Sequence, residues 1–145
     1  MIAVDTNLLV YAHRPESPLH SRALDLLEGL SGGQRAWGIP IHCLVEFAAV
    51  VSSGRLWKEP SRVEHIADQV AVWSDSPSCR LLGDDETVWE HALGLARRGL
   101  CEGGAWYDAR IAGACLAHGV TELWTADRDY TRFPALRTRN PLIGP

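Results

Sequence analysis

The chain has 145 residues, of which 46% are hydrophobic and 22% charged, as expected for one globular domain with a sizeable core. Its formal net charge of −4 gives no overall basic character of the kind that marks many nucleic-acid-binding proteins, although it leaves room for a local basic rim. The four cysteines form no C-x-x-C pair, which argues against zinc. No apolar run approaches the roughly 18 residues of a membrane span. We therefore expect a cytoplasmic protein outside the membrane.

Short strand-like runs alternate along the chain with segments of helical periodicity. We predict five strands, at Ile2–Val4, Arg35–Ile39, Cys79–Leu82, Glu122–Thr125 and Leu136–Thr138. The helices predicted between them are Asn7–His13, Leu19–Leu30 (begun by Ser17 and Pro18), Pro40–Ser52, Arg62–Trp73, Asp84 or Asp85 to Arg98, and Trp106–His118. This alternation predicts an α/β fold, a short parallel β-sheet of about five strands sandwiched between helices.

Two acidic residues follow predicted strands. Asp5 comes directly after the apolar run Ile2–Val4, and Asp127 follows the strand Glu122–Thr125, with Asp129 two residues later. A carboxylate at such a position is costly unless a cation or hydrogen bonds compensate it. Aspartate is also common in turns for purely local hydrogen bonding, so neither residue alone identifies a site.

Two further acids lie on predicted helices. Glu46 is embedded in the nearly all-apolar run Leu44–Val51, where a salt bridge to an arginine would explain it as well as a functional role. Asp108 lies in the first turn of Trp106–His118, where it would serve equally well as a cap. The carboxyl ends of parallel strands share one edge of a sheet, so the four acids can converge there. Converging carboxylates need cations, and oxygen ligands favour Mg²⁺ or Mn²⁺.

Taken together, these segments resemble PIN-domain ribonucleases, and specifically the VapC toxins of toxin–antitoxin pairs. The motifs are Val4-Asp5-Thr6-Asn7, the buried Glu46, Asp108–Ala112, and the stretch Leu123–Tyr130 with Arg132-Phe133-Pro134. The resemblance extends from Ile2 to about Ile143 and implies one PIN domain over residues 1–145. Tyr107 stands where many relatives have histidine, and Tyr130 where phenylalanine is usual. Neither departure removes a carboxylate.

The resemblance implies hydrolysis of RNA phosphodiester bonds assisted by Mg²⁺, for which Mn²⁺ could substitute. Asp5, Asp108 and Asp127 would be the main metal ligands and Asp129 a candidate outer ligand, while Glu46 would hold a second metal or orient the attacking water. Residues expected to hydrogen-bond the carboxylates are Thr6, Asn7 and Thr125. Candidates for RNA contacts are Arg14, Arg110, Arg128 and Arg132, although solvated or ion-paired roles are equally open to them.

The resemblance also implies partners: an RNA substrate, a second copy in a homodimer, and a small VapB-like antitoxin, with a larger toxin–antitoxin assembly as a further expectation. We expect the antitoxin to use an apolar groove between the second helix and the helices spanning Pro40–Trp73. Trp57 and Trp73 are candidates to line that groove.

Four other interpretations can be set against this resemblance. Leu30–Arg35 imitates an ABC-ATPase signature, but no phosphate loop accompanies it. A haloacid-dehalogenase-type phosphatase would need a second aspartate where Asn7 stands. An RNA-processing PIN nuclease without a toxin role, and a non-catalytic protein-binding module, remain open alternatives.

Overall fold

A five-stranded, entirely parallel sheet forms the centre of the molecule. The structure is a computed structural model and describes residues 1–144. The strands are β1 (Ile2–Val4), β2 (Trp37–Pro40), β3 (Cys79–Leu82), β4 (Glu122–Trp124) and β5 (Thr138–Arg139), in the spatial order β3-β2-β1-β4-β5. The predicted parallel sheet is confirmed.

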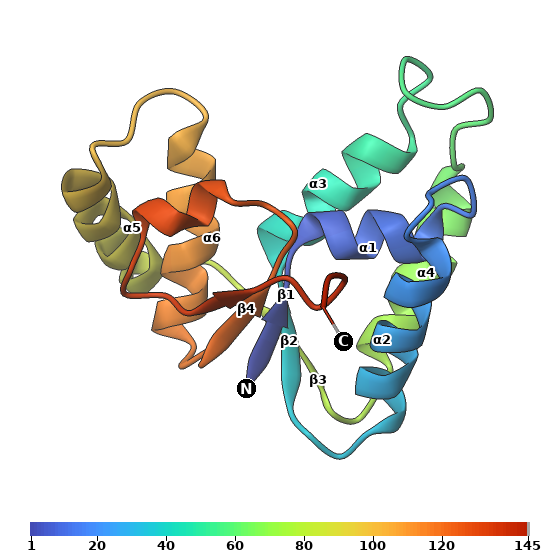
Figure 1. The fold of residues 1–145 in the computed structure, drawn as a ribbon, viewed down its shortest axis with the longest axis horizontal. Helices are drawn as coiled ribbons and strands as arrows, with labels where there is room; N and C mark the ends of the chain where they lie inside the picture. Colours follow the sequence, from blue (N-terminus) through green and yellow to red (C-terminus); the bar gives the residue numbers. More distant parts are fainter. Residues whose placement is uncertain (145) are drawn as a thin grey trace.

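Helices cover both sides of this sheet. They are α1 (Thr6–His13), α2 (His20–Gly32), α3 (Ile41–Val51), α4 (Val63–Ser74), α5 (Glu86–Gly99) and α6 (Ala105–Ala117), followed by the 3₁₀ turn η1 (Asp129–Arg132). In Figure 1 the α5–α6 pair lies on one side of the strands, and α1, α2 and α4 gather on the other. This arrangement confirms the predicted α/β sandwich. None of the helices within residues 1–144 has the length and apolar character needed to cross a membrane.

The second helix begins later than predicted. Its N-cap is Leu19, which makes no side-chain capping bond, so neither Ser17 nor Pro18 belongs to it. The Ser17 hydroxyl accepts the backbone N–H of Leu19 at 3.2 Å, and the Ser17 carbonyl accepts that of His20 at 3.0 Å. Ser17 therefore closes a separate turn before the helix, which is a common alternative use of serine.

Helices α5 and α6 approach each other closely at Gly113. A Cβ atom added there would lie 2.9 Å from both the backbone nitrogen of Ala92 and the carbonyl oxygen of Val88 on α5. Only glycine permits this approach without a backbone shift. The tight packing fixes α6, and with it Asp108, against α5.

The order of the strands places a crevice at the carboxyl ends of β1 and β4. From β1 the chain adds β2 and β3 on one side and then returns to β4 on the other, so the order reverses between β1 and β4. These two strands are neighbours, with Val4 opposite Trp124, and the Asp5 amide continues the pairing to the Trp124 carbonyl at 3.0 Å. Ligands of open α/β sheets bind at such a reversal.

Candidate active site

The four acids singled out in the sequence line a single cavity of about 380 Å³ at this crevice. Its lining comprises Asp5, Thr6, Asn7, Val10, Tyr11, Glu46, Val50, Asp108, Ile111, Asp127 and Tyr130. The four acids come from four separate segments: the N-terminus of α1, the middle of α3, the first turn of α6 and the loop after β4. No basic side chain is among the residues that line it, so the cavity wall is acidic on one part and apolar on another.

Asp5 is the most firmly held of the four carboxylates. It is 4% exposed and is the N-cap of α1, with Oδ1 accepting the backbone N–H of Thr6 at 2.8 Å. Its Oδ2 accepts the Thr125 hydroxyl at 2.6 Å and the Asn7 amide at 3.0 Å. Burial nevertheless raises the pKa of Asp5 above its ordinary value, because desolvation outweighs these hydrogen bonds. The hydrogen bonds expected of Asn7 and Thr125 are therefore present.

Glu46 is oriented from both of its oxygens. Oε2 accepts the Thr6 hydroxyl at 2.6 Å, and Oε1 lies 3.0 Å from Nε2 of His42, one helical turn earlier on α3. The contact between Oε1 and Nε2 is short, but it does not have the alignment of a hydrogen bond. Nε2 of His42 is buried and has no other hydrogen-bond partner within residues 1–144. The interaction with His42 is the largest factor that lowers the pKa of Glu46.

Asp108 shows that negative charge accumulates in this cavity. Its pKa is raised from 3.8 to about 6, first by burial and then by Asp127, Asp5, Asp129 and Glu46 in that order. Asp127 is fixed locally, because its Oδ1 accepts the backbone N–H of Asp129 at 2.8 Å while its own N–H donates to the Thr125 hydroxyl at 3.0 Å. Asp127 thus combines turn chemistry with a place in the cavity.

The set of oxygen donors fits a hard divalent cation. Carboxylate oxygens are the ligands that Mg²⁺ and Mn²⁺ prefer, and the raised pKa of Asp108 reports charge that no basic side chain in the cavity neutralises. Within residues 1–144, however, no three acidic, histidine or cysteine side chains are arranged so that they could hold a metal ion as they stand.

A second, more polar hollow of about 630 Å³ adjoins the first and shares Asp108 and Asp127 with it. Its lining includes Glu102, Asp129 and Arg132. Asp129 is therefore placed beside the four carboxylates and outside the main cavity, and Arg132 is the one predicted RNA-contacting arginine that lines either hollow.

The other three arginines have different surroundings. Arg14 is 6% exposed and donates to the Ser61 hydroxyl at 3.1 Å and the Glu59 carbonyl at 3.0 Å, with its guanidinium 4.1 Å from the centre of the Trp57 ring. The structure therefore does not place Arg14 at the site. Arg110 is held by Asp84 and His42, and Arg128 is exposed outside both hollows.

The expectation that Trp73 lines a partner groove is wrong. Trp73 is 3% exposed, and its ring packs against Phe47 with the ring centroids 5.1 Å apart. Trp57 is half-buried and donates its indole N–H to the Val50 carbonyl at 2.8 Å. The predicted groove beside the second helix stays a prediction.

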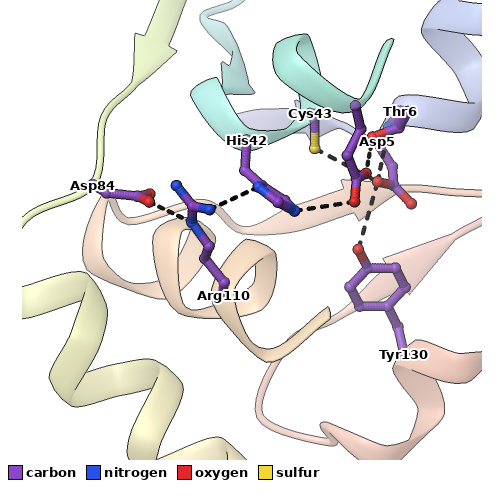
Figure 2. A network of polar contacts seen from close by, with 8 residues as sticks. Asp5, Thr6, His42, Cys43, Asp84, Arg110 and Tyr130 are labelled. Carbon is purple, nitrogen blue, oxygen red and sulfur yellow. Dashed lines mark hydrogen bonds and ion pairs between the residues drawn. The ribbon is translucent and has the colours of Figure 1, made fainter. Parts of the chain in front are cut away.

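The sequence patterns did not predict three residues that contact the acids of the site. His42 contacts Glu46, while Cys43 and Tyr130 approach Oδ1 of Asp5 at 3.6 and 3.5 Å (Figure 2). The four-residue spacing between His42 and Glu46 on one helix is a signal that could have revealed the first. Cys43 and Tyr130 carried no such signal, because only the folded chain brings them to Asp5.

Comparison with known proteins agrees with this geometry. Residues 2–136 match the family model described as PIN domain, so the chain belongs to the PIN-domain family. Within that family, several VapC ribonucleases are among the relatives of the chain. The chain is 34% identical over 144 residues to ribonuclease VapC43 of Mycobacterium tuberculosis, a match that covers 99% of this chain and 97% of the relative.

Solved structures support the fold. The chain superposes with a TM-score of 0.66 on a structure of VapBC2 from Rickettsia felis bound to a promoter DNA fragment, at 21% identity and covering 96% of this chain and 98% of the other. VapC20 of Mycobacterium tuberculosis, described as a sarcin-ricin loop cleaving toxin, gives a TM-score of 0.66 at 17% identity, covering 90% and 93%.

Proposed function

We propose that this chain is a divalent-metal-dependent endoribonuclease and the toxin of a toxin–antitoxin pair. The observation that carries the proposal is the single cavity lined by Asp5, Glu46, Asp108 and Asp127 with no basic side chain among its lining residues. An RNA phosphate would be repelled from such a cavity unless a cation lay between them. The ribonuclease names of the curated relatives support the same activity.

Each carboxylate has a proposed role that follows from how it is held. Asp5, Asp108 and Asp127 would hold Mg²⁺, or Mn²⁺ in its place, with Thr125 and Asn7 keeping Asp5 in one orientation. Glu46 has a lowered pKa and stays ionised, as a residue that accepts a proton from water or holds a second cation must. When bound, the metal would polarise the phosphate and lower the pKa of a bound water.

The apolar part of the cavity suits the remainder of a nucleotide. Val10, Tyr11 and Val50 line the cavity together with the acids and offer a surface for a ribose or base next to the scissile phosphate. Arg132, in the adjoining hollow, is placed to contact a neighbouring phosphate. Asp129, beside it, is proposed as an outer ligand that acts through solvent.

We further propose a small VapB-like antitoxin as the partner that restrains the toxin, and a homodimer as the state of the toxin itself. The Rickettsia felis structure is a VapBC complex, and its likeness to this chain extends over nearly the whole length. The proposed docking region is the predicted groove between α2 and the α3–α4 segment.

The decisive experiment is RNA cleavage by the purified chain with Mg²⁺ or Mn²⁺. We expect cleavage that stops on chelation and is lost in Asp5→Asn, while Asp25→Asn, at an exposed acid on α2, cleaves normally. Expression of the wild type should arrest growth, and co-expression with its antitoxin should restore it. Cleavage without growth arrest would favour an RNA-processing nuclease, and wild type without cleavage or metal binding would favour a non-catalytic module.

A further inference from the structure

A chain of polar contacts leads from Asp84 through Arg110 to His42 (Figure 2), and from His42 it continues to Glu46. It begins at Asp84, just before α5, whose Oδ2 accepts the Nε–H of Arg110 on α6. Nη1 of Arg110 lies 2.9 Å from Nδ1 of His42 on α3, and Nε2 of His42 lies 3.0 Å from Oε1 of Glu46. We call these four residues the His42 relay.

The chemistry of arginine fixes the tautomer of His42. A guanidinium has five N–H donors and no acceptor, and it stays protonated in proteins. In the contact with Arg110, Nδ1 of His42 must therefore be the acceptor and carries no hydrogen. The ring hydrogen of the neutral imidazole then lies on Nε2, the nitrogen that faces Glu46.

Packing keeps the imidazole in this orientation. His42 is 8% exposed, and the Tyr107 ring stacks on it with a centroid separation of 5.8 Å and an interplanar angle of 3°. Arg110, in turn, is anchored by Asp84. Glu46 is thus steadied through residues of α3, α6 and the segment before α5.

We propose that His42 is a positioning residue, which Arg110 holds in the Nε2–H tautomer so that it orients the Glu46 carboxylate toward the cavity shared with Asp5, Asp108 and Asp127. This inference rests on the proposed function. Thr6 donates a hydrogen bond to the other oxygen of Glu46 at 2.6 Å. The carboxylate is therefore held at both oxygens, by this bond and by the close contact with His42, and keeps lone pairs for a cation or water.

The use of histidine between Arg110 and Glu46 has a physical reason. An arginine that paired directly with Glu46 would bring a positive charge into the cavity and compete with a metal ion. An imidazole whose one ring hydrogen lies on Nε2 turns a polar N–H toward Oε1 of Glu46 without adding a charge. The relay therefore orients Glu46 while the positive charge stays one side chain away.

The tautomer can be read directly in the metal-free protein. In ¹⁵N NMR of the histidine rings at neutral pH, we expect Nδ1 of His42 to have a pyridine-like shift and Nε2 a pyrrole-like shift. In Arg110→Met, which has no donor, this preference should weaken. A pyrrole-like Nδ1 in the wild type would overturn the proposal.

The positioning role can be measured by calorimetric titration with Mn²⁺. We expect His42→Ala to weaken Mn²⁺ binding about tenfold, the lower end of what loss of a partner of a metal ligand costs. His42→Gln, whose side-chain amide can donate to Glu46, should recover most of the affinity, and Arg110→Met should show a smaller loss. His91→Ala, at an exposed histidine on α5, is the matched control and should bind as the wild type does.

The possible outcomes distinguish failure of the proposed function from failure of the positioning role of His42. If the wild type binds no Mn²⁺, the proposed function fails and the positioning role fails with it. If the wild type binds Mn²⁺ and both His42→Ala and Arg110→Met bind it equally well, only the positioning role is overturned. Thermal melts monitored by circular dichroism identify any variant that does not fold, and Arg110→Met, at a half-exposed position, then decides the matter.

Discussion

Replacing Asp108 by asparagine should stabilise the protein in the absence of metal, and it should abolish the nuclease activity proposed for the protein in the presence of metal. Asp108 carries a charge that burial and four neighbouring carboxylates oppose, and this opposition raises its pKa from 3.8 to about 6. Asparagine has nearly the same shape and no charge. The variant should therefore unfold at a higher urea concentration than the wild type at pH 7.5 in the presence of a chelator.

The expected gain follows from the pKa. Each tenfold change in proton affinity corresponds to about 1.4 kcal/mol, so a change from 3.8 to about 6 sets an upper value of about 3 kcal/mol. Solvent screening of a half-buried side chain reduces this to about 1–2 kcal/mol. Because the folded pKa is the higher one, the cost to the wild type is absent below pH 3.8, grows as the pH rises, and is complete above about pH 6. The advantage of the variant should therefore be smaller at pH 5 than at pH 7.5.

Addition of metal should reverse the order of stability. A ligand at 100 times its dissociation constant stabilises the folded state by about 2.7 kcal/mol, which exceeds the gain expected of the variant. Saturating Mn²⁺ should therefore leave the wild type as the more stable protein, while Asp108→Asn responds little. Asp25→Asn should behave as the wild type throughout. The reasoning is refuted if Asp108→Asn is no more stable than the wild type in chelator at pH 7.5.

Three further predictions concern packing and protonation. Gly113→Ala should lower the unfolding free energy by about 1–3 kcal/mol in urea titrations, because its Cβ meets the α5 backbone, whereas Gly94→Ala, whose Cβ would contact only the flexible Arg98 side chain, should be neutral or stabilising. Arg14→Met should lower the unfolding free energy in urea titrations by about 1–3 kcal/mol, because Ser61 and the Glu59 carbonyl lose their donor. The folded variant should cleave RNA at the wild-type rate, because Arg14 lies away from the acids. Burial lowers the pKa of His13 below its ordinary value of 6.5, so below pH 6.5 the unfolded chain binds a proton that the folded chain does not bind. Between pH 7.5 and 5.5 the unfolding free energy of the wild type should therefore fall more than that of His13→Gln. Equal losses in the two proteins would contradict this explanation.

The local sequence was sufficient to predict the bounds of those elements whose own residues mark them clearly. The strand Ile2–Val4 and the strand Cys79–Leu82 have the predicted bounds, and Asp85 caps α5 by accepting the Val88 N–H at 3.0 Å. Other ends depend on partners elsewhere in the chain. The last strand starts at Thr138 and not at Leu136, because pairing with β4 begins at Leu123 opposite Thr138.

The same division applies to the site. The convergence of Asp5 and Asp127 could be predicted, because a parallel sheet brings its carboxyl ends together. The position of Arg14 could not, since it depends on Ser61, which is 47 residues away in the chain. The tautomer of His42 could not be predicted either, because it is imposed by Arg110, 68 residues further along.

The hydrogen bond between Thr125 and Asp5 spans 120 residues of sequence and joins the residues that follow β4 and β1. During synthesis on a ribosome, a chain that has not yet emerged beyond Thr125 lacks this contact, and Asp127 with it. The proposed catalytic site can therefore form only late in translation, when all six α-helices of residues 1–144 and every strand except β5 have been made. On the proposed function, we expect a product that stops anywhere before β4 to lack nuclease activity, because it has neither Asp127 nor the Thr125 contact to Asp5. Only products of almost complete translation would then be toxic.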